Sequence, residues 1–283
     1  MTSSNPPTGP TGPTGPTSPT SPTSAVPDDS AALPGGERMP LLGFGTWQIT
    51  GDQARQTVLV AIDAGYRHVD TATVYGNEAE VGAALSQSGV PRHEVFVTTK
   101  CPPRDAGHEL ETLRQSLDAL QTDHVDLWLI HWPAGGGADV DVWRAFLEAR
   151  DEKLTRSVGV SNYSLRQLDE LVESTGHLPA VNQVEWSPFL FDRAVLDGHR
   201  DRGVVLEGYS ALRGGTLDHP AVRAVAEHHG RTPAQVIIRW HLQYGVVVIP
   251  KSVKEERIRA NAQVGDFELT DADMAEIDAL GKA

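Results

Sequence analysis

The amino-acid sequence predicts an α/β protein of the (β/α)8 TIM-barrel class. From residue 42 onward, short runs of β-branched or apolar residues alternate with stretches that have helical spacing. Eight such units fill roughly 240 residues, the usual size of this barrel, and the alternation gives a parallel sheet with right-handed crossovers. An open doubly wound sheet is the alternative. It usually carries G-x-G-x-x-G after its first strand, whereas Gly43–Gln48 ends in Gln, so the barrel is favoured.

The first thirty residues are expected to lie outside the barrel. They repeat Pro and Thr with Gly or Ser and contain few apolar residues, so burial cannot offset the entropy lost on ordering them. Residues 1–30 are therefore predicted to form a disordered low-complexity tail, and residues 31–283 the barrel. The tail lacks the basic and apolar segments of a secretory signal. Leu33–Glu37 is expected to form a turn or hairpin that closes the bottom of the barrel.

Strands and helices then follow one another along the chain. Apolar residues recur with helical spacing between strands, for example from Leu110 to Leu120 and from Leu165 to Val172. Thr232 is expected to cap a helix that begins at Pro233. The eight expected strands are Leu42–Thr46, His68–Thr71, Val95–Thr99, Asp126–His131, Ser157–Val160, Ala180–Val184, Val204–Tyr209 and Val246–Ile249.

The composition limits the classes of function. No run approaches the roughly 18 apolar residues that span a bilayer, so a membrane protein is not expected. The net charge of −14 repels phosphate backbones, so nucleic-acid binding is not expected either. The single cysteine, Cys101, excludes an internal disulfide and is expected to be structural. His228 and His229 lack a carboxylate or cysteine at ligand spacing, so no metal site is predicted. A cytoplasmic location is the simplest expectation.

Four ionisable residues follow successive predicted strands. Asp70 follows the second strand, Tyr75 lies in the loop after it, Lys100 follows the third and His131 the fourth. The carboxyl ends of barrel strands form one mouth, where active sites lie. Any one of these residues alone would more often be an ordinary rim residue. Four together, with complementary charges, predict a catalytic site.

These side chains suit proton donation to a carbonyl group. Tyrosine titrates near 10, which is too high for efficient acid catalysis around neutral pH. A cation about 4 Å away, at an effective dielectric constant near 20, contributes roughly 4 kcal/mol, or about three pKa units. Lys100 is therefore expected to lower the pKa of Tyr75, with Asp70 keeping Lys100 charged and His131 orienting the carbonyl. No metal is needed.

Seven segments carry a resemblance to a known family. The catalytic candidates lie in Asp70–Glu78 (DTATVYGNE), Thr98–Lys100 (TTK) and Leu129–Pro133 (LIHWP). The other segments are Met39–Trp47, Val158–Asn162, Asn182–Glu185 and Ile249–Ser252. In this order and spacing, over about residues 32–280, the chain resembles the aldo-keto reductases, and among them the bacterial 2,5-diketo-D-gluconate reductases and similar small-carbonyl reductases.

The resemblance implies that a monomer reduces a small aldehyde or ketone, an α-dicarbonyl or a keto-sugar by hydride transfer from NADPH, with Tyr75 as the general acid. The implied nicotinamide contacts are Ser161, Asn162, Gln183 and Tyr209, and those toward the pyrophosphate are Gly45, Thr46, Ser210 and Leu212. Lys251, Ser252 and Arg257 would meet the 2′-phosphate and Asn261 the adenine, while Trp47, Val74, Trp132 and His131 would wall the substrate pocket. Considered one at a time, Tyr209, Trp47 and Trp132 fit an ordinary buried position in the barrel core as well as they fit a binding site.

Three departures from the family pattern bear on binding. Ala260 stands where the family usually has Glu before the adenine-contacting Asn, which removes an expected contact with the adenine. Ala211 replaces a common Pro, and the loop to Pro220 is short, so this loop is expected to hold the cofactor less tightly than in relatives. The sequence ends at Ala283, whereas many relatives continue with a loop that lines the substrate site. A more open pocket and broad specificity are therefore expected.

Two other functions remain as alternatives. A Schiff-base aldolase would use Lys100 as its nucleophile, but a charged partner such as Asp70 would keep that amine protonated and poorly nucleophilic. A cofactor-binding barrel without turnover would not need all four of the catalytic candidates. The reductase is the favoured interpretation.

Overall fold

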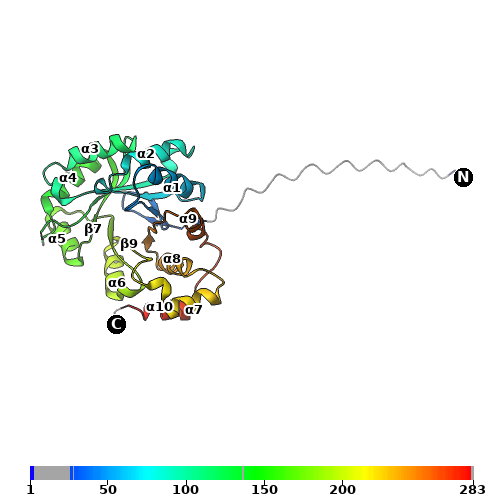
Figure 1. The fold of residues 1–283 in the computed structure, drawn as a ribbon. Helices are drawn as coiled ribbons and strands as arrows, with labels where there is room; N and C mark the ends of the chain where they lie inside the picture. Colours follow the sequence, from blue (N-terminus) through cyan, green and yellow to red (C-terminus); the bar gives the residue numbers. More distant parts are fainter. Residues whose placement is uncertain (3–25, 28, 136, 282–283) are drawn as a thin grey trace.

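The eight predicted strands form one parallel sheet that curls into a barrel (Figure 1). The computed structural model describes residues 1–2, 26–27, 29–135 and 137–281. The strands are β3 (Phe44–Gly45), β4 (His68–Asp70), β5 (Phe96–Cys101), β6 (Val125–Ile130), β7 (Thr155–Ser161), β8 (Val181–Glu185), β9 (Val205–Tyr209) and β10 (Val247–Val248). Each pairs with the next in chain order. The predicted (β/α)8 barrel is thereby confirmed, with strand ends displaced by one or two residues.

The first and last strands close the barrel. Leu42 forms a parallel bridge with Val248, and the Gly43 amide donates to the Val248 carbonyl at 2.9 Å. The Val248 amide in turn donates to the Leu41 carbonyl at 2.8 Å. A Cβ atom at Gly45 would meet the Ile249 carbonyl oxygen at 2.7 Å, so this approach of the two strands requires glycine.

Helices surround the sheet in Figure 1 and begin and end where the local sequence directs. Thr232 caps α8 through a capping box, as predicted, and Ser164 caps α5 in the same way. Gly203 ends α6 in the left-handed conformation, with φ of 71°. The helices are α1 (Gly51–Asp63), α2 (Glu78–Gln87), α3 (Glu109–Leu120), α4 (Val140–Asp151), α5 (Leu165–Thr175), α6 (Arg193–Arg202), α7 (Pro220–His228), α8 (Pro233–Gln243), α9 (Glu255–Ala262) and α10 (Asp271–Asp278).

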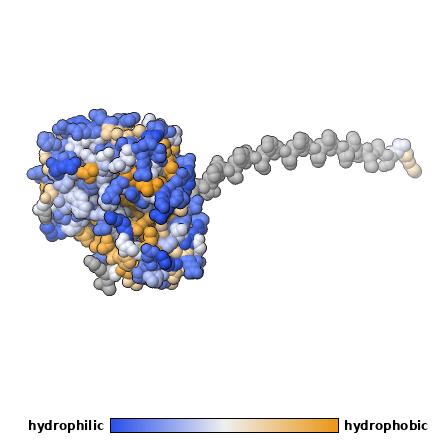
Figure 2. Space-filling model, in the orientation of Figure 1, coloured by the Kyte–Doolittle hydropathy of each residue, from blue (hydrophilic) through white to orange (hydrophobic). Residues whose placement is uncertain are grey.

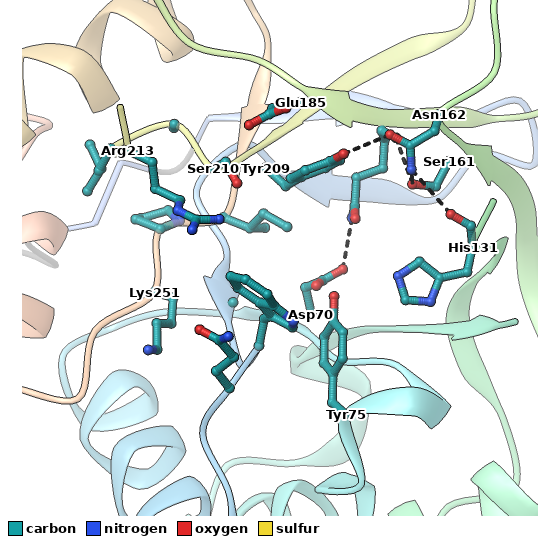
Figure 3. Close-up of a pocket in the computed structure, with 18 of the residues that line it drawn as sticks. Asp70, Tyr75, His131, Ser161, Asn162, Glu185, Tyr209, Ser210, Arg213 and Lys251 are labelled. Carbon is teal, nitrogen blue, oxygen red and sulfur yellow. Dashed lines mark hydrogen bonds between the residues drawn. The ribbon is translucent and has the colours of Figure 1, made fainter. Parts of the chain in front are cut away.

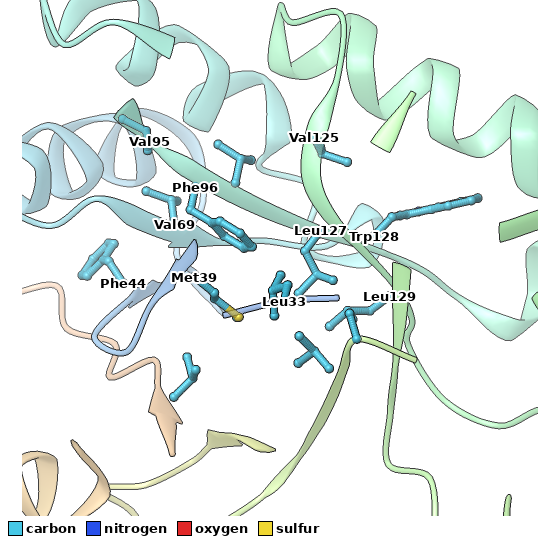
Figure 4. Packing of buried hydrophobic residues seen from close by; sticks show 14 of the residues in the cluster. Leu33, Met39, Phe44, Val69, Val95, Phe96, Val125, Leu127, Trp128 and Leu129 are labelled. Carbon is cyan, nitrogen blue, oxygen red and sulfur yellow. The ribbon is translucent and has the colours of Figure 1, made fainter. Parts of the chain in front are cut away.

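A hairpin covers the bottom of the barrel, as the sequence predicted. Strands β1 (Ser30–Ala32) and β2 (Arg38–Pro40) pair antiparallel around the turn that contains Gly35 and Gly36. The hairpin side chains Leu33 and Met39 are buried and lie among residues of the barrel strands (Figure 4). The hairpin therefore supplies part of the hydrophobic core.

The packed part of the chain begins slightly earlier than the predicted boundary at residue 30. Val26 packs against the core, the Asp29 carbonyl accepts from the Leu41 amide at 3.0 Å, and Ser30 is already in β1. The low-complexity tail predicted over residues 1–30 lies mostly outside the described residues. Its assignment as disordered stays a prediction.

Replacing Met39 by alanine should lower the free energy of unfolding by about 2–5 kcal/mol, because the side chain is fully buried under the barrel and would leave a cavity. Urea denaturation monitored by circular dichroism measures this change. Val253→Ala, at a side chain that is 40% exposed, is the control and should stay within about 0.5 kcal/mol of the parent. An equal effect of the two substitutions would mean that the hairpin does not support the barrel.

Hydrophilic residues dominate the face of the molecule drawn in Figure 2, and hydrophobic residues gather toward its middle and lower part. Of the helices in the described part of the chain, none combines the length and the apolar character that crossing a membrane requires.

Candidate active site

A cavity of about 660 Å³ opens at the carboxyl ends of the strands, where the barrel fold predicts an active site. Figure 3 shows Asp70, Tyr75 and His131 at one end of it and Arg213 and Lys251 at the other. The lining residues are Gly45, Trp47, Gln48, Asp70, Val74, Tyr75, His131, Trp132, Ser161, Asn162, Gln183, Glu185, Tyr209, Ser210, Ala211, Leu212, Arg213, Ile249, Pro250 and Lys251.

Lys100 and Asp70 form a buried ion pair under the cavity. The Lys100 ammonium lies 2.7 Å from Asp70 Oδ1 and donates to the Thr71 carbonyl at 2.8 Å, with the side chain fully buried. Burial lowers the pKa of Lys100, but the surrounding groups, chiefly the Asp70 carboxylate, together more than offset burial and raise the pKa above its usual value. Lys100 is therefore a permanently charged group in this site.

The Tyr75 hydroxyl completes this cluster. It lies 3.4 Å from the Lys100 ammonium, and that ammonium is also 5.0 Å from the centre of the Tyr75 ring. Burial raises the pKa of Tyr75, and Lys100 lowers it as expected, but the effect of burial is larger, so the net pKa is above its usual value and not below it. Tyr75 consequently keeps its proton throughout the neutral range, and Lys100 offsets part of the cost of the tyrosinate.

His131 faces Tyr75 across the cavity and is uncharged at neutral pH. The two rings meet edge to face with their centres 5.8 Å apart. Burial, assisted by the Lys100 charge, lowers the pKa of His131 to about 3. A neutral imidazole hydrogen-bonds a carbonyl oxygen without adding a charge, which agrees with an orienting role.

Several motif residues hold the catalytic loops and do not line the cavity. Asn77 accepts from the Thr71 hydroxyl at 2.7 Å and donates to the Thr46 and Ile49 carbonyls at 3.0 and 2.8 Å. The Thr73 hydroxyl donates to the Lys100 carbonyl at 2.8 Å. These bonds fix the loop that carries Tyr75 to the strands that carry Asp70 and Lys100.

A wall of amide and phenol groups stands opposite Tyr75. The Tyr209 hydroxyl donates to Asn162 Oδ1 at 2.8 Å, and Asn162 Nδ2 donates to Ser161 Oγ at 2.9 Å. Gln183 Nε2 donates to Asp70 Oδ2 at 2.9 Å and so ties this wall to the ion pair. The Tyr209 side chain is half-buried and lines the cavity, so one surface of its ring is available to a flat ligand.

The far end of the cavity carries positive charge. Lys251 and Arg213 line it, and neither forms an ion pair with a carboxylate among the described residues. Arg213 lies over the Trp47 ring, with its guanidinium carbon 5.1 Å from the ring centre. In a chain of net charge −14, two cations without carboxylate partners at one end of a cavity indicate a place for an anionic group.

The cavity brings together most of the predicted site residues. Of the predicted cofactor residues, Thr46, Ser252, Arg257 and Asn261 do not line it, and neither does the buried Lys100. The Thr46 hydroxyl donates to the Asp70 carbonyl at 2.9 Å, which gives it a supporting position. Arg257 is exposed on α9, Asn261 is buried on the same helix, and Ser252 is buried in the loop that precedes it. Trp47, Val74 and Trp132, the predicted substrate wall, all line the cavity.

Sequence reasoning missed six of the lining residues, which are Gln48, Glu185, Ala211, Arg213, Ile249 and Pro250. Arg213 had one available signal, since it follows the seventh predicted strand in an acidic chain with few cations. Gln48, together with Asn162 and Ser210, also has a positive φ, between 58° and 65°. Such strained conformations are common at functional sites but leave little trace in sequence.

The surroundings of His228 and His229, which lie outside the cavity, differ from expectation. Asp273, far along the chain, places its carboxylate oxygens 2.9 Å from His229 Nε2 and 3.8 Å from His228 Nδ1. A carboxylate therefore does lie close to both histidines. Asp273 Oδ2 also accepts from the Thr270 amide and hydroxyl and thus serves as part of the α10 cap.

Cys101 is buried on the outer side of β5, and burial raises the pKa of its thiol to about 12, which agrees with a structural role.

Comparison with known proteins agrees with this geometry. A family model described as the aldo/keto reductase family matches residues 41–282. An aldo-keto reductase of Mycolicibacterium vanbaalenii is 48% identical over 86% of this chain and 88% of its own length. The glyoxal reductase of Bacillus subtilis is 43% identical over 90% and 93% of the two chains. A crystal structure of an aldo/keto reductase from Brucella melitensis superposes with a TM-score of 0.87 at 39% identity, covering 90% of this chain and 98% of that one.

Proposed function

The chain belongs to the aldo/keto reductase family, and on that premise we propose that it reduces a small aldehyde or ketone to the alcohol with NADPH, using Tyr75 as the general acid. The observation that carries this proposal is the Lys100 ammonium, held 2.7 Å from Asp70 and 3.4 Å from the Tyr75 hydroxyl at the cavity floor. This arrangement places a protonated tyrosine beside a fixed cation, which stabilises the tyrosinate left after proton donation.

The cavity suits a nicotinamide dinucleotide in both shape and polarity. The half-buried Tyr209 ring offers a flat surface, and Asn162 and Gln183 offer amide groups beside it. Lys251 and Arg213 supply positive charge at the other end, where phosphate groups would lie. We therefore assign the first end to the nicotinamide and the second to the phosphates.

The bound nicotinamide would supply the hydride that reduces the carbonyl carbon. Tyr75 would donate its hydroxyl proton to the carbonyl oxygen as negative charge develops there. Lys100 would stabilise the resulting tyrosinate, and Asp70 would keep the ammonium charged and aimed at Tyr75. The neutral His131 would donate a hydrogen bond that aligns the carbonyl oxygen with the Tyr75 hydroxyl.

The substrate class rests on the cavity walls and on the relatives. Trp47, Val74 and Trp132 are large apolar side chains, each 41–49% exposed, that line the cavity. They favour a compact carbonyl compound with an apolar face. The Bacillus subtilis relative is named a glyoxal reductase, and another, from Pseudomonas putida and 41% identical, is named a morphine 6-dehydrogenase. Dicarbonyls and larger ketones therefore both belong among the compounds to test.

A Schiff-base aldolase is disfavoured by the same geometry. Lys100 is fully buried, its ammonium is engaged by Asp70 and the Thr71 carbonyl, and its pKa is raised. Such an amine is protonated and cannot attack a carbonyl. A barrel that only binds the cofactor would not require a tyrosine and a histidine in contact at the end of its cavity.

The direct test is a panel of aldehydes, α-dicarbonyls and keto-sugars, with NADPH consumption followed by its absorbance. We expect turnover with at least one class and no substrate adduct after borohydride treatment. NADPH binding without consumption on any carbonyl would favour the non-catalytic barrel. A borohydride-trapped adduct on Lys100 would favour the aldolase.

NADPH should be preferred over NADH, and Arg257→Ala should weaken NADPH binding by about ten- to a hundredfold, because one charge-assisted contact with the 2′-phosphate is lost. NADH affinity should hardly change, and high salt should narrow the difference between the cofactors. Fluorescence titration of both cofactors measures these effects.

Arg259→Ala is the matched control for Arg257, because it lies on the same helix but pairs with Glu255 and Asp63. It should leave the preference unchanged. Equal weakening of both cofactors by Arg257→Ala would show that this arginine is structural. Loss of the preference in Lys251→Ala alone would place the 2′-phosphate at the cavity rim.

A further inference from the structure

Glu207 is an unexplained acid in the interior of the barrel. It lies on β9 with a fully buried side chain, and neither of its carboxyl oxygens has a hydrogen-bond partner among the described residues. An ionised carboxylate in such a place carries a large desolvation cost. A buried polar group without partners calls for a physical explanation.

The nearest basic group to Glu207 is a histidine. His68 Nε2, on β4, lies 3.9 Å from Glu207 Oε1, and both side chains are fully buried. His68 Nδ1 lies 3.3 Å from the Pro40 carbonyl, which can only accept, so Nδ1 carries the proton. In the neutral ring, Nε2 is then an acceptor that faces Glu207, with the Thr98 hydroxyl 3.2 Å away as a second donor.

This pair lies next to the catalytic groups. Glu207 is in register with Gln183 on the neighbouring strand β8, and Gln183 bonds to Asp70, which pairs with Lys100. His68 is two residues before Asp70 on β4, so both side chains point into the barrel. The titratable groups that face Glu207 are thus His68 and Asp70 from β4, Lys100 from β5 and Tyr75 from the loop after β4.

We propose that Glu207 and His68 hold one proton between them as an uncharged pair, and that Glu207 thereby acts as a positioning residue for the chain Gln183–Asp70–Lys100. With the proton on Glu207, the neutral acid faces the acceptor Nε2 of His68 at 3.9 Å, and Asp70 remains the carboxylate that pairs with Lys100. The effect of the pair on turnover rests on the proposed function. The existence of the pair does not.

The electrostatics of the barrel interior agree with an uncharged pair at neutral pH. Burial, followed by the Asp70 charge, raises the pKa of Glu207 to about 8, and the Lys100 charge opposes this rise only in part. Burial also lowers the pKa of His68 to about 4. Above pH 8, a second negative charge would appear beside Asp70 and would raise the pKa of Tyr75 further, which weakens it as an acid.

The first test is the pH dependence of stability in Glu207→Gln, which keeps the shape but cannot ionise. Because the pKa of Glu207 is higher in the folded than in the unfolded protein, the folded parent binds more protons between about pH 4.5 and 8 and loses stability as pH rises. The unfolding equilibrium constant of the parent, divided by that of the variant, should rise by up to about tenfold per pH unit in this range. Urea denaturation between pH 5 and 9 measures it.

A ratio that does not change with pH would overturn the proposal, whatever the activity of either protein. Should Glu207→Gln fail to fold, the parent labelled with 13C at the glutamate carboxyl carbons provides the second measurement. One buried carboxyl should titrate near pH 8 by NMR. If every glutamate titrated in the normal acidic range, Glu207 would be ionised at neutral pH and the proposal would be wrong.

The second test is the pH profile of reduction with a substrate found in the panel. In the parent, kcat should fall as Glu207 ionises above about pH 8, and in Glu207→Gln this fall should move to higher pH. Glu78→Gln is the matched control, since Glu78 is a buried glutamate whose oxygens are satisfied by Thr99 and Ser116. It should keep the alkaline limb of the parent. An unchanged limb in Glu207→Gln would remove the positioning role, and absence of any reduction by the parent would instead contradict the proposed function.

Discussion

Replacing Tyr75 by phenylalanine should lower kcat for carbonyl reduction by about 10²–10⁴-fold, the usual contribution of a positioned general acid. The substitution removes only the hydroxyl that lies 3.4 Å from the Lys100 ammonium and keeps the ring that packs edge to face on His131. Cofactor affinity should stay within a few-fold of the parent, because the assigned cofactor contacts lie on the Tyr209 wall and at Lys251. Single-turnover kinetics and NADPH titration separate the two effects.

The control for Tyr75 is Tyr209→Phe, which removes the hydroxyl that donates to Asn162 and keeps the ring face beside the cavity. This variant should affect cofactor binding more than proton transfer. Retention of reduction by Tyr75→Phe within about threefold of the parent would mean that another group supplies the proton.

Replacing Lys100 by methionine should damage both stability and activity. The substitution leaves Asp70, which is 2% exposed, without its ammonium partner, and breaking a buried pair in this way usually costs about 3–5 kcal/mol. It also removes the cation beside the Tyr75 hydroxyl, so kcat should fall by about 10²–10³-fold. Urea denaturation and steady-state kinetics measure the two losses.

The double variant Asp70→Asn, Lys100→Met separates the two losses. Removing both charges should restore much of the stability, because no unpaired charge remains in the barrel. Activity should not return, since the field that stabilises the tyrosinate is still missing. Recovery of activity along with stability would show that Lys100 acts only as a structural partner of Asp70.

Local patterns in the sequence were enough to predict the barrel. Each strand is a short apolar run whose alternation with helices leaves one parallel topology, and each cap depends on residues within a few positions, as at Thr232 and Ser164. The catalytic set was predictable for a related reason. Asp70, Lys100 and His131 sit at or just after the carboxyl ends of neighbouring strands, and barrel closure forces such positions to meet.

The sequence by itself determined which residues could carry the chemistry, because residue type and strand position are local properties. The tertiary structure alone decided how those residues behave. Burial reversed the expected shift of the Tyr75 pKa, since desolvation depends on every element packed around the ring. The Arg213 guanidinium packs on the Trp47 ring, and Asp273 on a later helix pairs with His229. Glu207 lies beside His68 without a hydrogen bond. All of these contacts join residues far apart in the chain, and the free energy of a buried charge is set by such neighbours and not by the residues that flank it in sequence.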